Sequence, residues 1–403
     1  MATAQIICDD VISGLRSIPD NSVNMAVTSP PYWGLRNYSL PPRQWSDGTV
    51  SVLGEEQTLD LYVQHLVEIF GEMRRVLHPT ATFWLNIGDC YLHGGTQPTT
   101  GLHGVCRVPL PTKYKRITKV SKKQLGMVPA RVSIALQDDG WILRQDIIWA
   151  KGVSFCPTHV GAIMPESVRD RACWSYEHVY QLALNDRYFY DIDGCREPYA
   201  DVTRIEAEKV YTGQGQKDYT TAGAQDPSEV KRRVLKSIAS GSGRNLRNVW
   251  VIPKQNYKGA HFSTFPEALV EPIIKLGTSE KGCCPHCFAP WMRNTIREPI
   301  PRHIQEQFEA ARKATVADTG RTDGHTHRKP NYRRKILGTE WEPGCSCDVG
   351  AAQTVPAVVL DPFCGSGRAG IVAAKLGRNF IGIDQNEQYC NLAREACENI
   401  HSD

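Results

Sequence analysis

Apolar residues along the first 190 positions fall into blocks that predict strands alternating with helices. Apolar runs at 23–27, 82–87, 141–149 and 176–184 have the lengths of buried strands. Apolar side chains recur at helical spacing over 59–77, behind Thr58 as a suitable N-cap, and a second helix begins at Pro129 and ends before Gly140. This alternation predicts an α/β fold with a largely parallel sheet covered by helices.

The regular pattern is interrupted twice further along the chain. Residues 194–248 are polar, Gly-rich and basic, and residues 280–350 are polar and contain a group of cysteines. A strand at 358–360, a helix to about 376 and a strand at 380–383 then restore the α/β pattern. We predict one α/β domain assembled from residues 1–193, 249–279 and 351–403, with inserts at 194–248 and 280–350.

Composition places the 403-residue chain among ordinary globular proteins, with 41% apolar and 22% charged residues. No run of 18 apolar residues is present, so we expect no membrane span. Fourteen cysteines in a chain of this length, without a secretory start, favour reduced thiols in a cytoplasmic protein. The net charge of +4, from 47 basic and 43 acidic residues, neither requires nor excludes a polyanionic partner.

A Gly-rich motif near the C-terminus predicts a binding loop. The strand at 358–360 leads into Asp-Pro-Phe-Cys-Gly-Ser-Gly at 361–367, where Gly365, Gly367 and Gly370 fit G-x-G-x-x-G. Glycines let a backbone pass close to a ligand, and Asp384, after the next strand, is suited to hold ribose hydroxyls. The simpler interpretation is a tight turn that packs a helix against a strand.

The second motif, Ser29-Pro30-Pro31-Tyr32, directly follows the first predicted strand. Two prolines remove two backbone donors and stiffen the turn, so its carbonyls and the Ser29 hydroxyl are available as acceptors. The Tyr32 ring beside them suits a planar ligand with an exocyclic amino group. The simpler interpretation is a stiffened strand exit with an exposed aromatic side chain.

Together the two motifs resemble those of the amino-methylating DNA methyltransferases, which transfer a methyl group from S-adenosylmethionine to N4 of cytosine or N6 of adenine. The catalytic motif precedes the cofactor motif, which resembles the circularly permuted β group. The resemblance implies a Rossmann-like methyltransferase fold with a mixed seven-stranded sheet. It also implies a target-recognition insert at 194–248, a zinc-ribbon-like insert at 280–350, and a prokaryotic or phage-encoded enzyme that acts on a flipped base.

The resemblance also assigns roles to residues. It makes Ser29, Pro30, Pro31 and Tyr32 catalytic, and it makes Asp10, Phe262, Phe265, Asp361, Phe363, Gly365, Gly367 and Asp384 cofactor-binding. Asp9 could take the place of Asp10, whose simpler role is a helix N-cap, and both Phe262 and Phe265 could be core residues. Ser at the first tetrad position is usual for N4-cytosine enzymes and Asp for N6-adenine enzymes. Cytosine is therefore favoured, and adenine stays open.

Four cysteines suggest a metal site. Cys284 and Cys287 form C-x-x-C, Cys345 and Cys347 form C-x-C, and four thiolates suit a structural Zn²⁺ that crosslinks a polar insert. Cys283 could replace Cys284, and the histidines at 286, 325 and 327 are further candidate ligands. Ordinary reduced cysteines are the alternative.

Basic residues gather in three acid-free runs, at 113–123, 231–247 and 328–335. Such runs in inserts of a DNA enzyme favour phosphate contacts with double-stranded DNA. The candidates for DNA binding are Lys113, Lys115, Arg116, Lys119, Lys122, Lys123, Arg232, Arg233, Arg244 and Arg247. A homodimer and a separate cognate endonuclease stay open as partners. Methylation of RNA or a small amine, and a non-catalytic zinc-containing nucleic-acid binder, are the competing functions.

Overall fold

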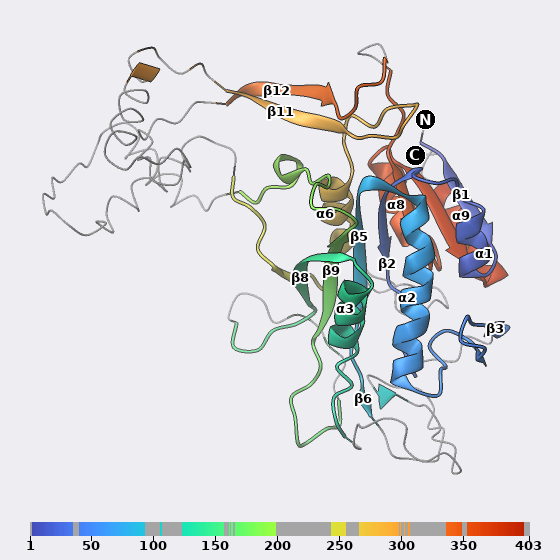
Figure 1. Cartoon of the computed structure of the whole chain (residues 1–403). Coiled ribbons are helices and arrows are strands. Elements are labelled where there is room, and N and C mark those ends of the chain that lie inside the picture. The colour runs from blue at the N-terminus through green and yellow to red at the C-terminus, as the bar shows by residue number, and fades with distance from the viewer. Residues whose placement is uncertain are drawn as a thin grey trace, which may run out of the picture. The chain divides into compact units, whose positions relative to one another are not determined.

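The structure is a computed structural model of the whole chain (Figure 1). It describes residues 2–34, 40–92, 105–106, 123–156, 161, 163, 166–198, 243–254, 266–297, 299, 302, 305–306, 336–348 and 353–398. The chain divides into two compact units. The larger unit comprises Met1–Gly194, Arg247–Met292 and Pro343–Asp403, and the smaller comprises Cys195–Leu246 and Arg293–Glu342.

A mixed eight-stranded sheet forms the centre of the larger unit. Its strands, in order across the sheet, are β1 (Ala4–Cys8), β14 (Asn379–Asp384), β13 (Val358–Asp361), β2 (Val23–Thr28), β5 (Leu77–Ile87), β9 (Tyr176–Ala183), β8 (Ile142–Ala150) and β10 (Val249–Val251). All neighbours pair in parallel except β9, which is antiparallel to both β5 and β8. The four strands from β1 to β2 therefore point the same way, although they come from opposite ends of the chain.

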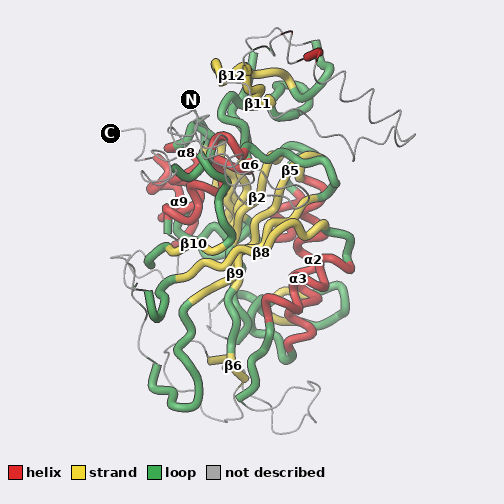
Figure 2. The backbone as a smooth tube through the Cα atoms, turned by 90° about the vertical axis from the view of Figure 1, so that its left-hand side faces the viewer, coloured by secondary structure: helices red, strands yellow, loops and turns green. Residues whose placement is uncertain are grey.

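Helices cover both faces of this sheet (Figure 2). One side carries α1 (Val11–Arg16), α2 (Leu59–Val76) and α3 (Val128–Asp138), and the other carries α6 (Glu267–Gly277), α8 (Arg368–Lys375) and α9 (Glu387–Glu398). The Thr58 hydroxyl caps α2 by accepting from Leu61 N, as the sequence predicts. The remaining described elements are the 3₁₀ helix Ile192–Gly194 and the short strands β3 (Arg43–Gln44), β4 (Val50–Ser51), β6 (Tyr91–Leu92), β7 (Val105–Cys106), β11 (Trp291–Arg297) and β12 (Ile336–Pro343).

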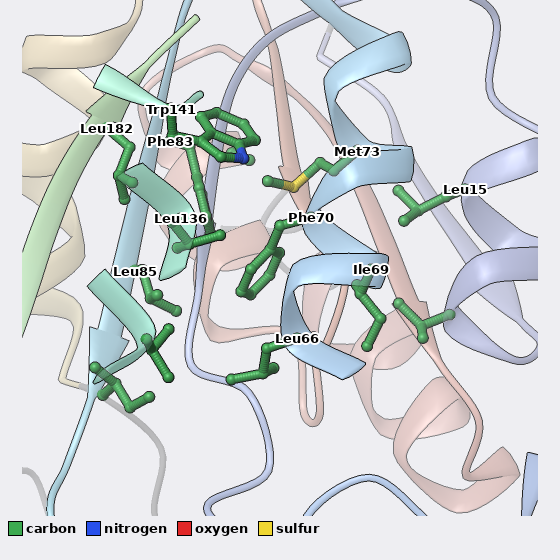
Figure 3. Close-up of a cluster of buried hydrophobic side chains, with 14 of the residues drawn as sticks. Leu15, Leu66, Ile69, Phe70, Met73, Phe83, Leu85, Leu136, Trp141 and Leu182 are labelled. Atoms are coloured by element: carbon green, nitrogen blue, oxygen red, sulfur yellow. The ribbon is translucent and has the colours of Figure 1, made fainter. Parts of the chain in front are cut away.

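The main core lies between the sheet and the first three helices (Figure 3). The apolar face of α2 presents Phe70 and Met73 toward Phe83 of β5, and Trp141 and Leu136 close the same space. Phe70 and Phe83 stack at a tilt with ring centroids 4.7 Å apart. Burial of such large side chains contributes about 1.5–3 kcal/mol each. This core holds the strands whose ends form the candidate site.

The predicted α/β class is confirmed, and the strand count of seven is wrong. The sheet has eight strands, and two of them, β1 and β10, match none of the six strand runs that the sequence predicts. Neither has the features of a buried apolar run: β1 has three exposed residues of five, and β10 has three residues, two of them exposed. Cys90 is disulfide-bonded, against the prediction of reduced thiols, and the cysteine spacing carried no signal of this bond. Within the described ranges, no helix combines the length and the apolar character that a membrane span requires.

Candidate active site

A pocket lies where the parallel strands β1, β14, β13 and β2 end. Carboxyl ends of parallel neighbours meet at one edge of a sheet, which is where open α/β sheets bind ligands. The pocket is lined by residues that follow all four strands, among them Asp9, Asp10, Ser29, Pro31, Asp361, Phe363, Gly365, Asp384 and Tyr389. Nearly all of the described residues that the sequence assigns to the cofactor therefore share one pocket with Ser29 and Pro31, two residues of the tetrad that the sequence predicts to be catalytic.

The Gly-rich loop turns tightly into α8. Gly365 has a φ of 49° and Gly367 a φ of 76°, which is a backbone region that L side chains rarely adopt. A Cβ at Gly367 would lie 3.0 Å from the Ala393 Cα, whereas a Cβ at Gly370 would lie 2.7 Å from the Phe380 ring. The first two glycines thus shape the loop at the pocket, and the third allows close packing of α8.

Two aspartates, the buried Asp361 and the half-buried Asp384, hold this loop in place. Asp384 accepts hydrogen bonds from Gly365 N (2.9 Å) and Asn386 N (2.8 Å). Asp361 accepts from Phe363 N (3.1 Å) and from the Thr28 hydroxyl (2.5 Å). Burial raises the pKa of Asp384, and burial raises the pKa of Asp361 to about 7, against the hydrogen bonds that lower it.

Asp10, which lines the pocket, has three partners. Its carboxylate caps α1 by accepting from Ile12 N (3.1 Å) and Ser13 N (3.3 Å), and it forms an ion pair with Arg43. The N-cap role that the sequence offered as the simpler alternative is therefore realised, and the side chain lines the pocket as well. Arg43 also lies over the Trp45 ring, 5.0 Å from its centroid.

The turn at residues 29–32, which the sequence predicts to be catalytic and which we call the catalytic turn, begins where β2 ends. Pro31 O accepts from the Tyr62 hydroxyl of α2 (2.8 Å), which anchors the turn to the main core. The Ser29 hydroxyl donates to the Tyr32 oxygen (3.1 Å). Gly88 leaves room for the Tyr32 ring, because a Cβ there would lie 2.8 Å from Tyr32 Cε2.

Three residues that the sequence did not single out lie behind Tyr32. The Tyr32 hydroxyl donates to Glu177 Oε2 (2.8 Å), and Asn86 Nδ2 donates to the same oxygen (2.9 Å). Asn86 Nδ2 also lies 3.3 Å from Ser29 Oγ, and Lys151 Nζ forms an ion pair with Glu177 Oε1. No motif signals these residues, because β5, β8 and β9 bring them together from distant parts of the chain.

The protonation states follow from burial and charge. Burial, and then the Glu177 charge, raise the pKa of Tyr32 well above its ordinary value, so the phenol keeps its proton at neutral pH. Burial alone would raise the pKa of Glu177, but the Lys151 charge and the hydrogen bonds from Lys151, Tyr32 and Asn86 lower it overall. Glu177 is therefore ionised although only 8% of the residue is exposed.

The four predicted metal-ligating cysteines come together. The sulfur atoms of Cys284, Cys287, Cys345 and Cys347 all lie within 4.8 Å of one another. Cys283 is directed elsewhere, since its thiol donates to Asn24 Oδ1 (3.3 Å). The histidines at 325 and 327 lie outside the described residues.

Many of the predicted ligand contacts also lie outside the described residues. These are Phe262, Phe265, Lys113, Lys115, Arg116, Lys119, Lys122, Arg232 and Arg233, together with the run at 328–335. Of the described candidates for DNA binding, Lys123 forms an ion pair with Asp170 (2.8 Å) and Arg244 with Glu197 (2.7 Å). Arg247 accepts a hydrogen bond from the Trp250 indole through its backbone oxygen.

Comparison with known proteins identifies the family. The family model of the N6/N4 methyltransferases, described as DNA methylase, matches residues 23–289 and 351–395. Type II methyltransferase M.XycI of Xanthomonas campestris pv. cyanopsidis is 29% identical over 402 residues, covering 98% of this chain and 87% of that protein. Type II methyltransferase M.SfiI of Streptomyces fimbriatus is 30% identical over 412 residues, covering 94% of this chain and 87% of that protein. The chain therefore belongs to the N6/N4 family of DNA methylases.

Proposed function

We propose that this protein transfers a methyl group from S-adenosylmethionine to the exocyclic N4 of a flipped cytosine in a specific DNA sequence. The observation that carries the proposal is the position of Ser29 at the edge of the pocket that the Gly-rich loop lines. Ser at this tetrad position favours cytosine, and N6 of adenine is the second candidate. The type II relatives support a role in restriction-modification.

The pocket residues fit the cofactor. A left-handed glycine turn lets the backbone approach the ligand, and Asp384 presents a carboxylate suited to ribose hydroxyls. We assign Asp10, Phe363, Gly365, Gly367 and Asp384 to cofactor binding, with Asp361 behind the loop and Phe262 and Phe265 as further proposed contacts. When bound, the cofactor supplies an already activated methyl group, so no cysteine nucleophile is required. Cys364 accordingly has no catalytic role here.

The catalytic turn would position the target amine. An exocyclic amine is a poor nucleophile because its lone pair is delocalised into the ring. Acceptance of its hydrogens by Ser29 Oγ and Pro30 O favours a lone pair directed at the methyl group, while Pro31 keeps the turn stiff. A base must leave the duplex to reach such a pocket, at a cost of a few kcal/mol. Stacking on Tyr32 returns about 1–3 kcal/mol of this cost.

Further parts of the proposal concern organisation. We propose the circularly permuted β-group arrangement, with catalytic and cofactor-binding segments at 1–193, 249–279 and 351–403. Target recognition is assigned to 194–248, and the basic runs to contacts with double-stranded DNA. A homodimer, a separate cognate endonuclease and a cytoplasmic location stay predictions.

Sequencing of methylated DNA tests the base and the site together. Unmethylated genomic DNA is incubated with the protein and the cofactor, and N4-methylcytosine is then distinguished from N6-methyladenine. We expect N4-methylcytosine in one sequence context. Ser29→Ala should abolish methylation while cofactor binding persists, whereas Ser46→Ala, in an exposed loop, should leave both unchanged. Methylation of adenine, or full turnover by Ser29→Ala, contradicts the assignment.

We also propose that the four clustered cysteines bind a structural Zn²⁺. Sulfur ligands at about 2.3 Å from a tetrahedral zinc lie about 3.8 Å apart, and the observed separations are within 4.8 Å. Asn24 of β2 ties this segment to the sheet, since its Nδ2 donates to Phe288 O (2.8 Å) and its Oδ1 accepts from the Cys283 thiol (3.3 Å).

Metal analysis tests the zinc proposal. Purified protein should contain one zinc per chain, and Cys287→Ser should lose the metal and lower the melting temperature. Cys173→Ser, which lies outside the cluster, is the matched control and should retain the zinc. A zinc content far below one per chain would remove the proposal.

A further inference from the structure

A series of hydrogen bonds behind the catalytic turn leads from Ser29 through Tyr32 to Glu177, and Asn86 Nδ2 lies beside it as a donor to Ser29 Oγ (3.3 Å) and the Tyr32 oxygen (3.1 Å). Lys151 donates to Oε1 of Glu177, and Asn86 and Tyr32 donate to Oε2. The Ser29 hydroxyl in turn donates to the Tyr32 oxygen. Glu177 is the end point of this series, and Ser29 is the member of the series that lines the pocket.

The direction follows from the chemistry of the groups. An ionised carboxylate only accepts hydrogen bonds, so the single proton of the Tyr32 hydroxyl must point toward Glu177. The Tyr32 oxygen is then an acceptor, and it takes the single proton of Ser29. With that proton committed, Ser29 Oγ can only accept a hydrogen bond from a ligand in the pocket. A ligand amine satisfies this requirement, and a ligand carbonyl does not.

We propose that Glu177, held by Lys151, is a positioning residue that sets the specificity of the site for an exocyclic amine against a carbonyl at the same ring position. The inference rests on the proposed contact between Ser29 and the target base. It predicts that the protein binds duplex DNA with cytosine at the target position in preference to uracil, which differs by that exchange. With uracil, Ser29 Oγ and the base carbonyl would be two acceptors facing each other without a proton between them. This should weaken the binding of the uracil duplex on the order of 10- to 100-fold.

Among the residues that the structure describes, the charged and titratable groups that act on Glu177 are Lys151 and Tyr32. Lys151 faces it from the end of β8, and Tyr32 faces it from the catalytic turn, with Tyr62 of α2 acting on Tyr32. Asn86 of β5 is neutral. Lys151 is thus the positive partner that favours the ionised carboxylate, against the effect of burial on its pKa.

Glu177→Gln tests the proposal because it reverses one hydrogen bond at nearly constant shape. Lys151 would hold the amide carbonyl, so the amide NH₂ would face Tyr32 and the direction of the hydrogen bonds would be reversed. We would measure dissociation constants with full-length protein, the unreactive cofactor analogue sinefungin, and duplexes of the methylated sequence with cytosine or uracil at the target. For each protein, the dissociation constant for the uracil duplex is divided by that for the cytosine duplex. Comparison of this ratio between the variant and the wild type cancels the difference in the cost of base flipping between the two duplexes.

We expect this ratio to fall by 10-fold or more in Glu177→Gln, and kcat to fall with little change in KM. Tyr32→Phe keeps the ring but removes the link between Ser29 and Glu177, so it should also lower the ratio. Lys151→Met should shift the acid limb of the pH profile of kcat to higher pH. Glu271→Gln and Lys275→Met on α6 make the same exchanges in a surface pair and should match the wild type.

The outcomes separate two failures. If the wild type methylates DNA and folded Glu177→Gln keeps the wild-type ratio, the inference about Glu177 is wrong and the proposed function stands. If the wild type methylates no DNA, the proposed function itself is wrong. If Glu177→Gln does not fold, as judged by its melting curve, an unchanged ratio in Tyr32→Phe decides against the inference.

Discussion

Asp361 connects the two motifs of the site through one side chain. Its carboxylate accepts from Thr28, the residue before the catalytic turn, and from Phe363 in the Gly-rich loop. Only 2% of the residue is exposed, and within the part of the chain that the structure describes its hydrogen-bond donors are uncharged. A buried carboxylate without a positive partner favours its neutral form, which is why the pKa is raised to about 7.

This shift predicts a pH-dependent stability. The unfolded chain releases the Asp361 proton near pH 3.8 and the folded protein near pH 7. Between these values the folded state binds one more proton, so this group lowers the free energy of unfolding as pH rises and has no further effect above about 7. Asp361→Asn is neutral at every pH and lacks the effect.

Melting temperatures of the wild type and Asp361→Asn between pH 4 and pH 8 measure this contribution of Asp361 to stability. The melting temperature of the wild type, minus that of Asp361→Asn, should fall as pH rises across this window. A difference that stays constant or rises would show that Asp361 is ionised in the folded protein. Because other titrating groups are common to both proteins, the subtraction isolates this carboxyl.

At the scale of elements, the turn into α8 depends on its glycines. Alanine at Gly367 would carry a left-handed backbone and a Cβ 3.0 Å from Ala393, so Gly367→Ala should lower the free energy of unfolding by about 1–2 kcal/mol. Gly71 within α2 is the matched control, because a Cβ there meets nothing within 4 Å. Gly71→Ala should raise stability by roughly 0.5–1 kcal/mol. Denaturant titrations measure both, and equal effects would contradict the prediction.

The elements also show what the sequence could predict. Long periodic segments such as α2, and buried runs such as β2, form at the predicted positions because burial dictates their pattern. β1 and β10 depend on neighbouring strands more than on their own residues, so no local pattern marks them. The same holds for the site, where Ser29 and Gly365 could be predicted because they belong to sequence motifs. Glu177 could not, because it lies 145 positions from Tyr32 and meets it only through the pairing of β9 with β5.

At the scale of the whole molecule, the net charge of +4 conceals local concentrations of positive charge. Seventeen basic side chains fall in the three acid-free runs. We therefore predict that the logarithm of the DNA association constant falls steeply and linearly with the logarithm of salt concentration. Replacing Lys113, Lys115 and Arg116 by Gln should reduce the slope by about 0.9 for each phosphate that the variant no longer neutralises.

Fluorescence anisotropy of a labelled duplex at several salt concentrations measures these slopes. Lys275→Gln, on the surface of α6, changes one charge outside the basic runs and should leave the slope unaltered. A slope near zero for the wild type would contradict phosphate binding by these runs. An unaltered slope in the triple variant would exclude the run at 113–123 from the interface.

The strand order determines when the site can assemble during synthesis of the chain. β1 hydrogen-bonds within the sheet to β14 alone, and β2 reaches β13 only after more than 330 further residues have been synthesised. On the ribosome, the catalytic turn therefore exists long before the loop and the aspartates that complete its pocket. Pairings so distant in sequence form slowly. A nascent chain has no assembled site until Asp384 has emerged, and modification of DNA must lag behind the first appearance of the protein.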